Sequence, residues 1–441
     1  MSVKVCKFGG TSVASSENIK KVKAIIEREK ERRFVVVSAP GKRFKGDEKI
    51  TDMLYACARL ARESGSCEKI FAVVAERYLE IAKGLDLKID MKPLLLQTQN
   101  DIDRIKTDDF AASRGEYLSA VMMAEVLGFS FVDAAEIVKF DSSGKLDAEY
   151  TNDLMKRKLE EIGCAVIPGF YGAIPGDDIK TFSRGGSDIT GALVARAVGA
   201  SVYENWTDVN GFRTADPRIV SGATQMQTLC YHELRELSYM GADVLHSESI
   251  FPVKQSGIPI NIRNTFEPEN AGTMIVPDEN YVGNGRTITG IAGKKDFTVI
   301  TVEKAMMNTE IGFARKILTV LERYGVCFEH MPTGIDTISI VIEAKYLQNG
   351  LKEKIITRIR EAVEPDRITV HDDIALIATV GFGMQNVIGI SGRLFSSLGK
   401  AGINVVMIDQ GSSEINIIIG VENGDYGGAI RAIYSEFAAK E

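Results

Sequence analysis

The sequence predicts an α/β protein in which a sheet lies between layers of helices, followed by a smaller α+β region. Short apolar, β-branched runs alternate with longer stretches whose apolar residues recur at helical spacing, which is typical of a sheet covered by helices. A chain of 441 residues is too long for one hydrophobic core, so we expect two or three domains. The composition changes near residues 280–284. We therefore expect a first domain over 1–282 and a second region over 283–441.

The elements of the first domain follow from these two periodicities. Strands are predicted at 3–8, 34–38, 129–133, 165–169, 201–206 and 259–263. Helices are predicted from residue 17 onward and at 50–62, 69–82, 94–104, 114–127, 152–161 and 187–198.

The second region contains a repeated pattern of strand, helix, strand, strand and helix. The first copy reads 297–302, 311–324, 326–331, 337–342 and 351–361, and the second reads 374–380, 389–398, 403–409, 414–421 and 427–438. We expect two small βαββαβ-type units, at about 295–365 and 370–441. They are either a regulatory tail or a pair of packing modules without a ligand.

Composition narrows the class of protein. The sequence is 45% hydrophobic and 26% charged, as in ordinary globular proteins, and its net charge of −7 argues against nucleic-acid binding. No apolar run approaches the roughly 18 residues of a membrane span, and residues 1–4 lead into a strand rather than a signal peptide. Six scattered cysteines and four scattered histidines lack zinc-site spacing. We expect a cytoplasmic protein with reduced thiols, no membrane segment and no metal ligands of its own.

The first candidate site is the turn after the first strand, Lys7-Phe8-Gly9-Gly10-Thr11. Glycines without a Cβ let backbone amides approach a phosphate closely, and a lysine adds positive charge. A helix begins soon afterward, and its N-terminus also favours an anion. An ordinary glycine turn is the alternative.

The second candidate is the segment 183–188, before an alanine-rich helix. The planar guanidinium group of Arg184 is suited to binding a carboxylate, and Ser187 could cap the helix. Asp188 could hold a lysine or act near a metal. The alternative is a simple helix cap with a surface arginine.

Two further segments carry polar side chains. The loop after the strand ending at Trp206 reads Thr207-Asp208-Val209-Asn210-Gly211 and lies where open α/β sheets bind ligands, although an Asx turn explains it equally. Glu116, in a segment expected to open a helix, could bind an ammonium group or act only as a first-turn acid. No Walker loop, dinucleotide fingerprint or serine-triad motif is present, and three glycine turns with a lysine favour phosphoryl transfer.

Together these motifs resemble the aspartokinases of the amino acid kinase family. The resemblance rests on KFGGTSV at 7–13, RGE at 114–116, SRGGSD at 183–188, WTDVNG at 206–211 and ADPR at 215–218. It implies an amino acid kinase-like α/β/α sandwich, and the tail resembles that family's paired ACT domains. It also implies ATP-dependent phosphorylation of the side-chain carboxylate of L-aspartate, the first step of lysine, threonine and methionine biosynthesis, without a homoserine dehydrogenase extension.

The resemblance implies a role for each matching residue. Lys7 would neutralise the phosphates and be oriented by Asp188, while Mg²⁺ would bridge the phosphates of ATP with little protein ligation. The aspartate-binding residues would be Ser38, Thr51, Glu116, Arg184 and Ser187. The nucleotide-binding residues would be Lys7, Phe8, Gly9, Gly10, Thr11, Thr207, Asp208, Arg213, Arg218, Asp243 and Val244.

Two departures from the family pattern concern the nucleotide. Arg213 stands where some members have tyrosine, and Asp243 stands where some have a lysine. An acid cannot replace a lysine that faces phosphate, so we expect only backbone or ribose contact at Asp243 and Val244.

The tail resembles the feedback site of lysine-sensitive members. Residues at effector-contacting positions are Met307, Phe313, Phe328 and Glu329, and Glu329 could pair with the ammonium of a lysine effector. Core packing is the alternative for Met307 and the two phenylalanines. The resemblance implies lysine, or else threonine, as the inhibitor and a homodimer or larger assembly. The competing functions are phosphorylation of glutamate, acetylglutamate or a nucleotide monophosphate, and non-catalytic amino-acid sensing.

Overall fold

The chain folds into two compact units. The computed structural model describes residues 2–183, 185–242, 245, 251–283 and 285–437. The first unit comprises 1–212, 225–234 and 243–282, and the second comprises 213–224, 235–242 and 283–441. The second unit thus takes two segments that precede the composition change in the sequence.

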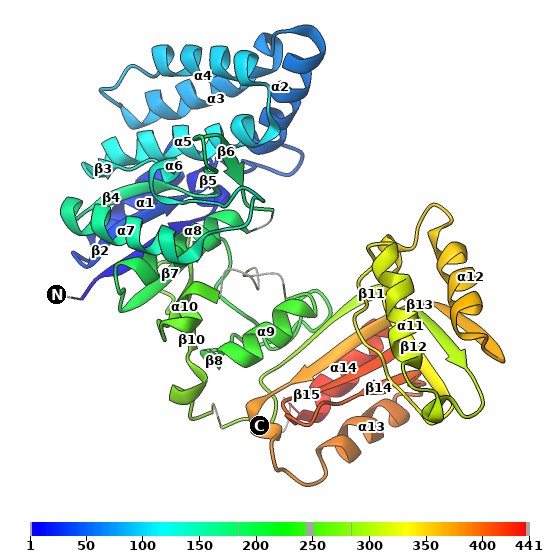
Figure 1. Ribbon diagram of the computed structural model, residues 1–441. Coiled ribbons are helices and arrows are strands. Elements are labelled where there is room, and N and C mark those ends of the chain that lie inside the picture. Colours follow the sequence, from blue (N-terminus) through cyan, green and yellow to red (C-terminus); the bar gives the residue numbers. More distant parts are fainter. Residues whose placement is uncertain (1, 184, 243–244, 246–250, 284, 438–441) are drawn as a thin grey trace. The chain divides into compact units, whose positions relative to one another are not determined.

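The first unit is built on an eight-stranded sheet in the order β3-β4-β2-β1-β7-β9-β10-β8 (Figure 1). Neighbouring strands are parallel except for the antiparallel β9–β10 pair. The strands are β1 (Lys4–Phe8), β2 (Arg32–Val37), β3 (Ser130–Phe131), β4 (Ala165–Pro168), β7 (Val202–Thr207), β8 (Thr228–Cys230), β9 (Ile260–Asn264) and β10 (Thr273–Val276). A separate hairpin pairs β5 (Tyr171–Ala173) with β6 (Ile179–Thr181).

Helices cover both faces of this sheet, which confirms the predicted sandwich. They are α1 (Ser16–Glu27), α2 (Ile50–Ser64), α3 (Glu68–Leu85), α4 (Met91–Ile105), α5 (Asp108–Leu127), α6 (Ala134–Ile137), α7 (Ala148–Ile162), α8 (Gly186–Ala197) and α10 (Phe251–Gln255), while α9 (Tyr231–Tyr239) belongs partly to each unit. Because side chains alternate along a strand, Cys6 and Phe8 enter the core with α1 to α5, whereas Lys7 faces α8.

The second unit is a five-stranded antiparallel sheet in the order β12-β11-β13-β15-β14. Its strands are β11 (Gly290–Glu303), β12 (Thr337–Glu343), β13 (Arg367–Val380), β14 (Met407–Asp409) and β15 (Asn416–Glu422). Its helices are α11 (Phe313–Arg323), α12 (Leu351–Val363), α13 (Ile390–Lys400) and α14 (Tyr426–Phe437). One hydrophobic cluster packs under α11 and α12 and another under α13 and α14, as expected for two repeats.

Several predicted elements have different bounds. The long helix begins at Asp108 rather than 114, because Thr107 accepts a hydrogen bond from the Phe110 amide and caps it there. Residues 326–331 form no strand; His330 makes only an isolated bridge with Val341. The expected strand 403–409 is limited to β14. The short elements β5, β6, β8, β10, α6, α9 and α10 were not predicted, since three to nine residues carry little periodicity.

Candidate active site

The centre of the candidate site is an ion pair between the end of β1 and the start of α8. Lys7 Nζ lies 2.5 Å from Asp188 Oδ1, and the two side chains are only 10% and 15% exposed. Asn205 on β7 stands beside Lys7 in the sheet, and its Nδ2 donates to the same Asp188 oxygen at 2.9 Å. Asn205 itself is buried. The Asp188 carboxylate is therefore held from two sides and fixes the position of the lysine ammonium.

The turn after β1 brings the backbone close to its neighbours. The Gly9 amide donates to the Trp206 carbonyl at 3.0 Å, and Gly10 begins a short 3-10 turn over Gly10–Val13. A Cβ at Gly10 would lie 2.9 Å from the Ala39 carbonyl oxygen, so only glycine fits there. Gly9 has a φ of −71°, and Gly10 is not among the positive-φ residues. Gly10 is therefore required by the close approach of its neighbours, whereas a Cβ at Gly9 would lie 3.7 Å from the Trp206 carbonyl oxygen, an ordinary contact.

Side chains from two loops meet beside this turn. Thr11 Oγ1 donates to Asp208 Oδ2 at 3.3 Å, and Thr207 Oγ1 donates to Asp208 Oδ1 at 3.2 Å. Asp208 is exposed. The loops after β1 and β7 thus place two hydroxyl groups and a carboxylate at the carboxyl edge of the sheet.

The start of α8 differs from the prediction. The helix is capped by Gly185, which has a φ of 57°, and no side chain caps it. Ser187 therefore does not act as the cap; it lies buried within the first turn, next to Asp188. A Cβ at Gly169 would lie 2.7 Å from Ser187 Oγ, so the turn after β4 packs directly against this serine.

Glu116 lies well inside α5, not in a first turn as expected. Its carboxylate accepts a hydrogen bond from the Ala39 amide, while Oε2 has no hydrogen-bond partner among the described residues. Desolvation raises the pKa of Glu116 to about 8, partly offset by the Ala39 bond and the charge of Lys7. A buried carboxylate with an unused oxygen is suited to a cationic ligand group.

Ser38 and Thr51 lie on either side of one loop. The Ser38 amide donates to the Phe8 carbonyl at 3.1 Å, directly after β2. Thr51 is the second residue of α2, and both side chains are half-buried. Lys7 near the end of β1, Ser38 directly after β2, and Glu116, which accepts from the Ala39 amide, thus all lie near the carboxyl ends of β1 and β2.

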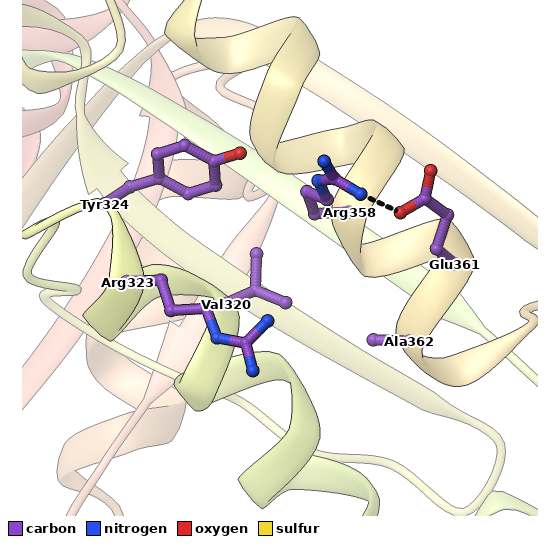
Figure 2. Close-up of a pocket in the computed structure, with 6 residues that line it drawn as sticks. All are labelled: Val320, Arg323, Tyr324, Arg358, Glu361 and Ala362. Carbon is purple, nitrogen blue, oxygen red and sulfur yellow. Dashed lines mark hydrogen bonds and ion pairs between the residues drawn. The ribbon is translucent and has the colours of Figure 1, made fainter.

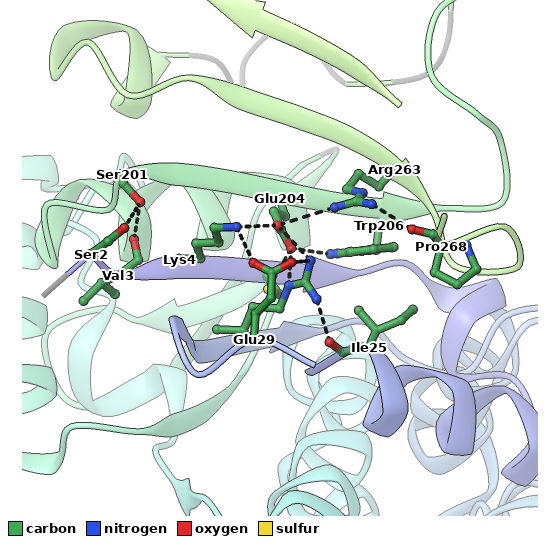
Figure 3. Close-up of polar contacts among 12 residues, drawn as sticks. Ser2, Val3, Lys4, Ile25, Glu29, Ser201, Glu204, Trp206, Arg263 and Pro268 are labelled. Atoms are coloured by element: carbon green, nitrogen blue, oxygen red, sulfur yellow. Dashed lines mark hydrogen bonds and ion pairs between the residues drawn. The ribbon is translucent and has the colours of Figure 1, made fainter. Parts of the chain in front are cut away.

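A second polar cluster lies within the same sheet, and sequence reasoning missed it. Glu204 accepts hydrogen bonds from Arg32 Nε at 2.8 Å and Cys6 Sγ at 3.3 Å. It also accepts one from Trp206 Nε1 at 3.0 Å (Figure 3). The guanidinium groups of Arg32 and Arg263 lie 5.3 Å and 4.6 Å from the centre of the Trp206 ring. Trp206 stacks on Phe8, so this cluster fixes the two strands that carry Lys7 and Asn205.

The remaining matched residues, one for aspartate and four for the nucleotide, are either outside the described residues or in the second unit. Arg184, Asp243 and Val244 lie outside the described residues. Arg213 and Arg218 belong to the second unit, where Arg213 donates to the Ala223 carbonyl at 3.0 Å and Arg218 pairs with Asp216 at 2.7 Å.

The effector-matched residues are divided between core and surface. Met307 and Phe313 are buried in the cluster under α11 and α12, whereas Phe328 is 39% exposed. Glu329 is half-buried and accepts a hydrogen bond from the Tyr239 hydroxyl. A surface pocket of about 540 Å³ lies between α11 and α12, lined by Val320, Arg323, Tyr324, Arg358, Glu361 and Ala362 (Figure 2). None of the four effector-matched residues lines that pocket.

In the part of the chain that the structure describes, no group of three or more His, Cys, Asp or Glu side chains could hold a metal ion. Among the same residues, no helix combines the length and apolar character that crossing a bilayer requires.

Comparison with known proteins gives consistent matches along the chain. The amino acid kinase family model matches residues 2–264, and an ACT domain model matches 377–437. Aspartokinase 3 of Bacillus subtilis is 36% identical over 463 residues, covering 99% of both chains. The crystal structure of Clostridium acetobutylicum aspartate kinase is 49% identical with a TM-score of 0.90, covering 99% of this chain and 100% of that one.

Escherichia coli aspartokinase III is a more distant relative. Its complex with lysine and aspartate is 25% identical with a TM-score of 0.76, covering 99% of both chains. Its complex with aspartate and ADP, at 23% identity, has a TM-score of 0.79 and covers 98% of this chain and 99% of that one. The second likeness supports the fold alone.

Proposed function

Because this chain belongs to the amino acid kinase family and is an aspartate kinase, we propose that it transfers the terminal phosphoryl group of ATP to the side-chain carboxylate of L-aspartate. The product is 4-phospho-L-aspartate, which begins lysine, threonine and methionine biosynthesis. The observation that carries the proposal is the buried Lys7–Asp188 pair beside the Gly9–Gly10 turn. A fixed cation beside a glycine turn suits a reaction that depends on positioning and charge neutralisation.

On the nucleotide side, Lys7 neutralises charge on the transferred phosphoryl group. Gly9, Gly10 and Thr11 line the phosphate path, with Thr207 and Asp208 beside it. Mg²⁺ fits here because the phosphate oxygens supply most of its ligands and the nearby Asp208 carboxylate is exposed. By family resemblance, Phe8, Arg213, Arg218, Asp243 and Val244 complete the nucleotide site.

On the acceptor side, Glu116 binds the α-ammonium of aspartate. Its unpartnered oxygen and raised pKa support this role, since an ammonium group supplies the missing positive partner. Arg184 binds the α-carboxylate, and Ser38, Thr51 and Ser187 make the other contacts proposed for the substrate.

The acceptor is tested by initial rates with ATP and aspartate, glutamate or N-acetylglutamate. We expect turnover with aspartate and far less with the others. Acetylglutamate lacks a free ammonium group and cannot pair with Glu116. Turnover with glutamate but none with aspartate would assign the chain to a different acceptor.

We propose that an end-product amino acid, lysine rather than threonine, inhibits the enzyme through the second unit. Support comes from the ACT match and from the lysine bound by the E. coli relative. An effector changes activity only if it binds one state of the enzyme better than another. Paired repeats of this kind also favour a homodimer or larger assembly in the cytoplasm.

Inhibition is tested with Glu329→Ala. This variant should lose lysine inhibition while its uninhibited rate stays within about twofold, because a carboxylate partner for the ammonium is removed. Glu322→Ala on α11 is the matched control, since Glu322 is an exposed acid of the same unit. Undiminished inhibition of the Glu329 variant, measured as the lysine concentration for half-inhibition, would remove Glu329 from the effector site.

A further inference from the structure

We propose that Arg77 on α3 is a positioning residue that holds the acceptor side of the active site in place. The inference rests on the proposed function, because it assigns Ser38 and Thr51 to aspartate. Arg77 is only 4% exposed, although arginine is usually a surface residue. Its contacts explain why this charge is buried.

One guanidinium group holds both ends of an active-site loop. Residues 41–49 connect Ser38, Ala39 and Pro40 with α2, whose second residue is Thr51. Arg77 Nη2 donates to the Gly41 carbonyl, and Nη1 donates to the Glu48 carbonyl at 2.8 Å. Nη2 also lies 3.2 Å from Asp47 Oδ2. Because both ends are tied to one rigid group, their separation is fixed.

The loop reaches the phosphate turn through Gly41. The Gly41 amide donates to the Gly10 carbonyl at 2.8 Å, and a Cβ at Gly41 would lie 2.8 Å from the Gly10 carbonyl carbon. The phosphate turn also has bonds of its own, from the Gly9 amide to Trp206 and from Asn18 Nδ2 to the Thr11 carbonyl at 2.9 Å. Loosening the loop should therefore displace the acceptor residues more than the phosphate turn.

The next residue of α3 supports a second acceptor segment. The buried Tyr78 hydroxyl donates to the Gly115 carbonyl at 2.7 Å, directly before Glu116. A Cβ at Gly115 would lie 2.7 Å from the Ala39 Cβ, so α5 and the loop after β2 are in close contact there. Two consecutive residues of α3 thus hold the segments that carry Ser38, Thr51 and Glu116.

These contacts indicate a role beyond stability. Arg77 Nε has no hydrogen-bond partner among the described residues, and a buried, incompletely paired cation stabilises a fold less than apolar packing would. Arg77 itself lines a surface pocket, whose other walls are the apolar Phe44, Met53 and Val73 and the charged Arg43, Asp47, Glu48, Glu76 and Glu80.

The test compares Arg77→Met with Arg77→Lys in the full-length enzyme. Arg77→Met should raise KM for aspartate roughly tenfold because the acceptor residues lose their fixed separation. Its KM for ATP should stay within about twofold, since the phosphate turn keeps its own bonds. Arg77→Lys should recover part of the loss, because an ammonium can reach one carbonyl. Arg104→Met, which removes an exposed arginine of α4, is the control and should change neither KM.

The outcomes separate this inference from the proposed function. If the wild-type enzyme does not phosphorylate aspartate, the proposed function fails. If it does, and Arg77→Met changes both KM values equally or neither, the positioning role fails. If Arg77→Met does not fold, by its melting curve, Arg77→Lys and Tyr78→Phe decide: each should raise KM for aspartate alone, and an unchanged KM in both would overturn the inference.

Discussion

Two buried carboxylates of the first unit, Glu204 and Glu116, differ in how fully the protein supplies them with hydrogen-bond donors. Glu204 on β7 is surrounded by donors: Arg32, Trp206 and Cys6 all bond to it, and Lys4 Nζ lies 3.7 Å away. Glu116 on α5 keeps one oxygen without a partner among the described residues. Both side chains are at most 5% exposed, so burial alone does not distinguish them.

The difference suggests a different role for each carboxylate. A buried carboxylate that the protein satisfies by itself contributes to a defined fold, whereas one with an unused oxygen can pair with a ligand. Glu204 holds neighbouring strands together, and the proposed partner of Glu116 is the ammonium group of the substrate. Variants of Glu204 and Glu116 test this contrast directly, and variants of Lys7 and Asn205 test the candidate site on the neighbouring strands.

The largest effect is expected from Glu204→Ala. It leaves Arg32 as a buried cation without its main partner, which should lower the free energy of unfolding by about 3–5 kcal/mol. Urea denaturation measures the change. Glu27→Ala is the matched control, since its exposed pair with Lys23 should contribute no more than about 1 kcal/mol. An unchanged denaturation midpoint for Glu204→Ala would contradict the structural role.

Next in size is Lys7→Ala, near the carboxyl end of β1. Removing a fixed cation from the transferred phosphoryl group should reduce kcat roughly 10²–10³-fold. Lys4→Ala, at the other end of β1, is the control and should leave kcat within about twofold. The expectation fails if both lysine variants turn over aspartate at the wild-type rate.

A pH dependence is expected from Glu116. In the free enzyme the raised pKa keeps Glu116 largely protonated below about pH 8, whereas binding an ammonium group needs the carboxylate. The value of kcat/KM for aspartate should therefore rise as pH increases, by up to about tenfold per unit, and level off above about pH 8. Glu116→Gln should lower kcat/KM and remove this slope. A wild-type profile that is flat between about pH 6 and 8 would rule out this assignment.

The smallest effect is expected from Asn205→Ala. This variant removes the hydrogen bond to Asp188 Oδ1 but keeps the Lys7–Asp188 pair. A hydrogen bond to a charged group contributes about 1.5–3 kcal/mol, so kcat should fall roughly 10- to 100-fold with little change in either KM. Asn280→Ala, which removes an exposed asparagine side chain, is the control and should leave kcat unchanged. An unchanged kcat would leave Asp188 oriented by Lys7 alone.

The residues whose positions the sequence could predict stand next to glycine turns or at the ends of strands. Lys7, Asp188 and Asp208 stand beside glycine turns or strand ends, and local patterns place them at one edge of a parallel sheet. The helix that carries Glu116 begins at Asp108, earlier than the predicted start at 114. The signal was present in Thr107-Asp108-Asp109, a capping residue followed by two acids.

Other parts of the site could not be predicted, because their meaning depends on distant partners. Glu204 meets Arg32, which is 172 positions away, and Arg77 bonds to carbonyls 29 and 36 positions away. The residues next to them in the sequence give no indication of these contacts. The lengths of β11 and β13 were missed for another reason: Asp296 and Asp373 adopt positive φ within these strands, and polar residues around them interrupt the apolar pattern.

These two long strands bind the repeats of the second unit together. β11 pairs with β13 from Gly290–Val380 to Glu303–Arg367, while β12 covers only 297–303 of β11 and β15 only 374–380 of β13. Separating the two repeats would leave the backbone amides and carbonyls along β11 or β13 without their hydrogen-bond partners. Such an exposed strand edge is prone to aggregate. A chimera that exchanges the second unit between two such enzymes should therefore take both β11 and β13 from the same parent.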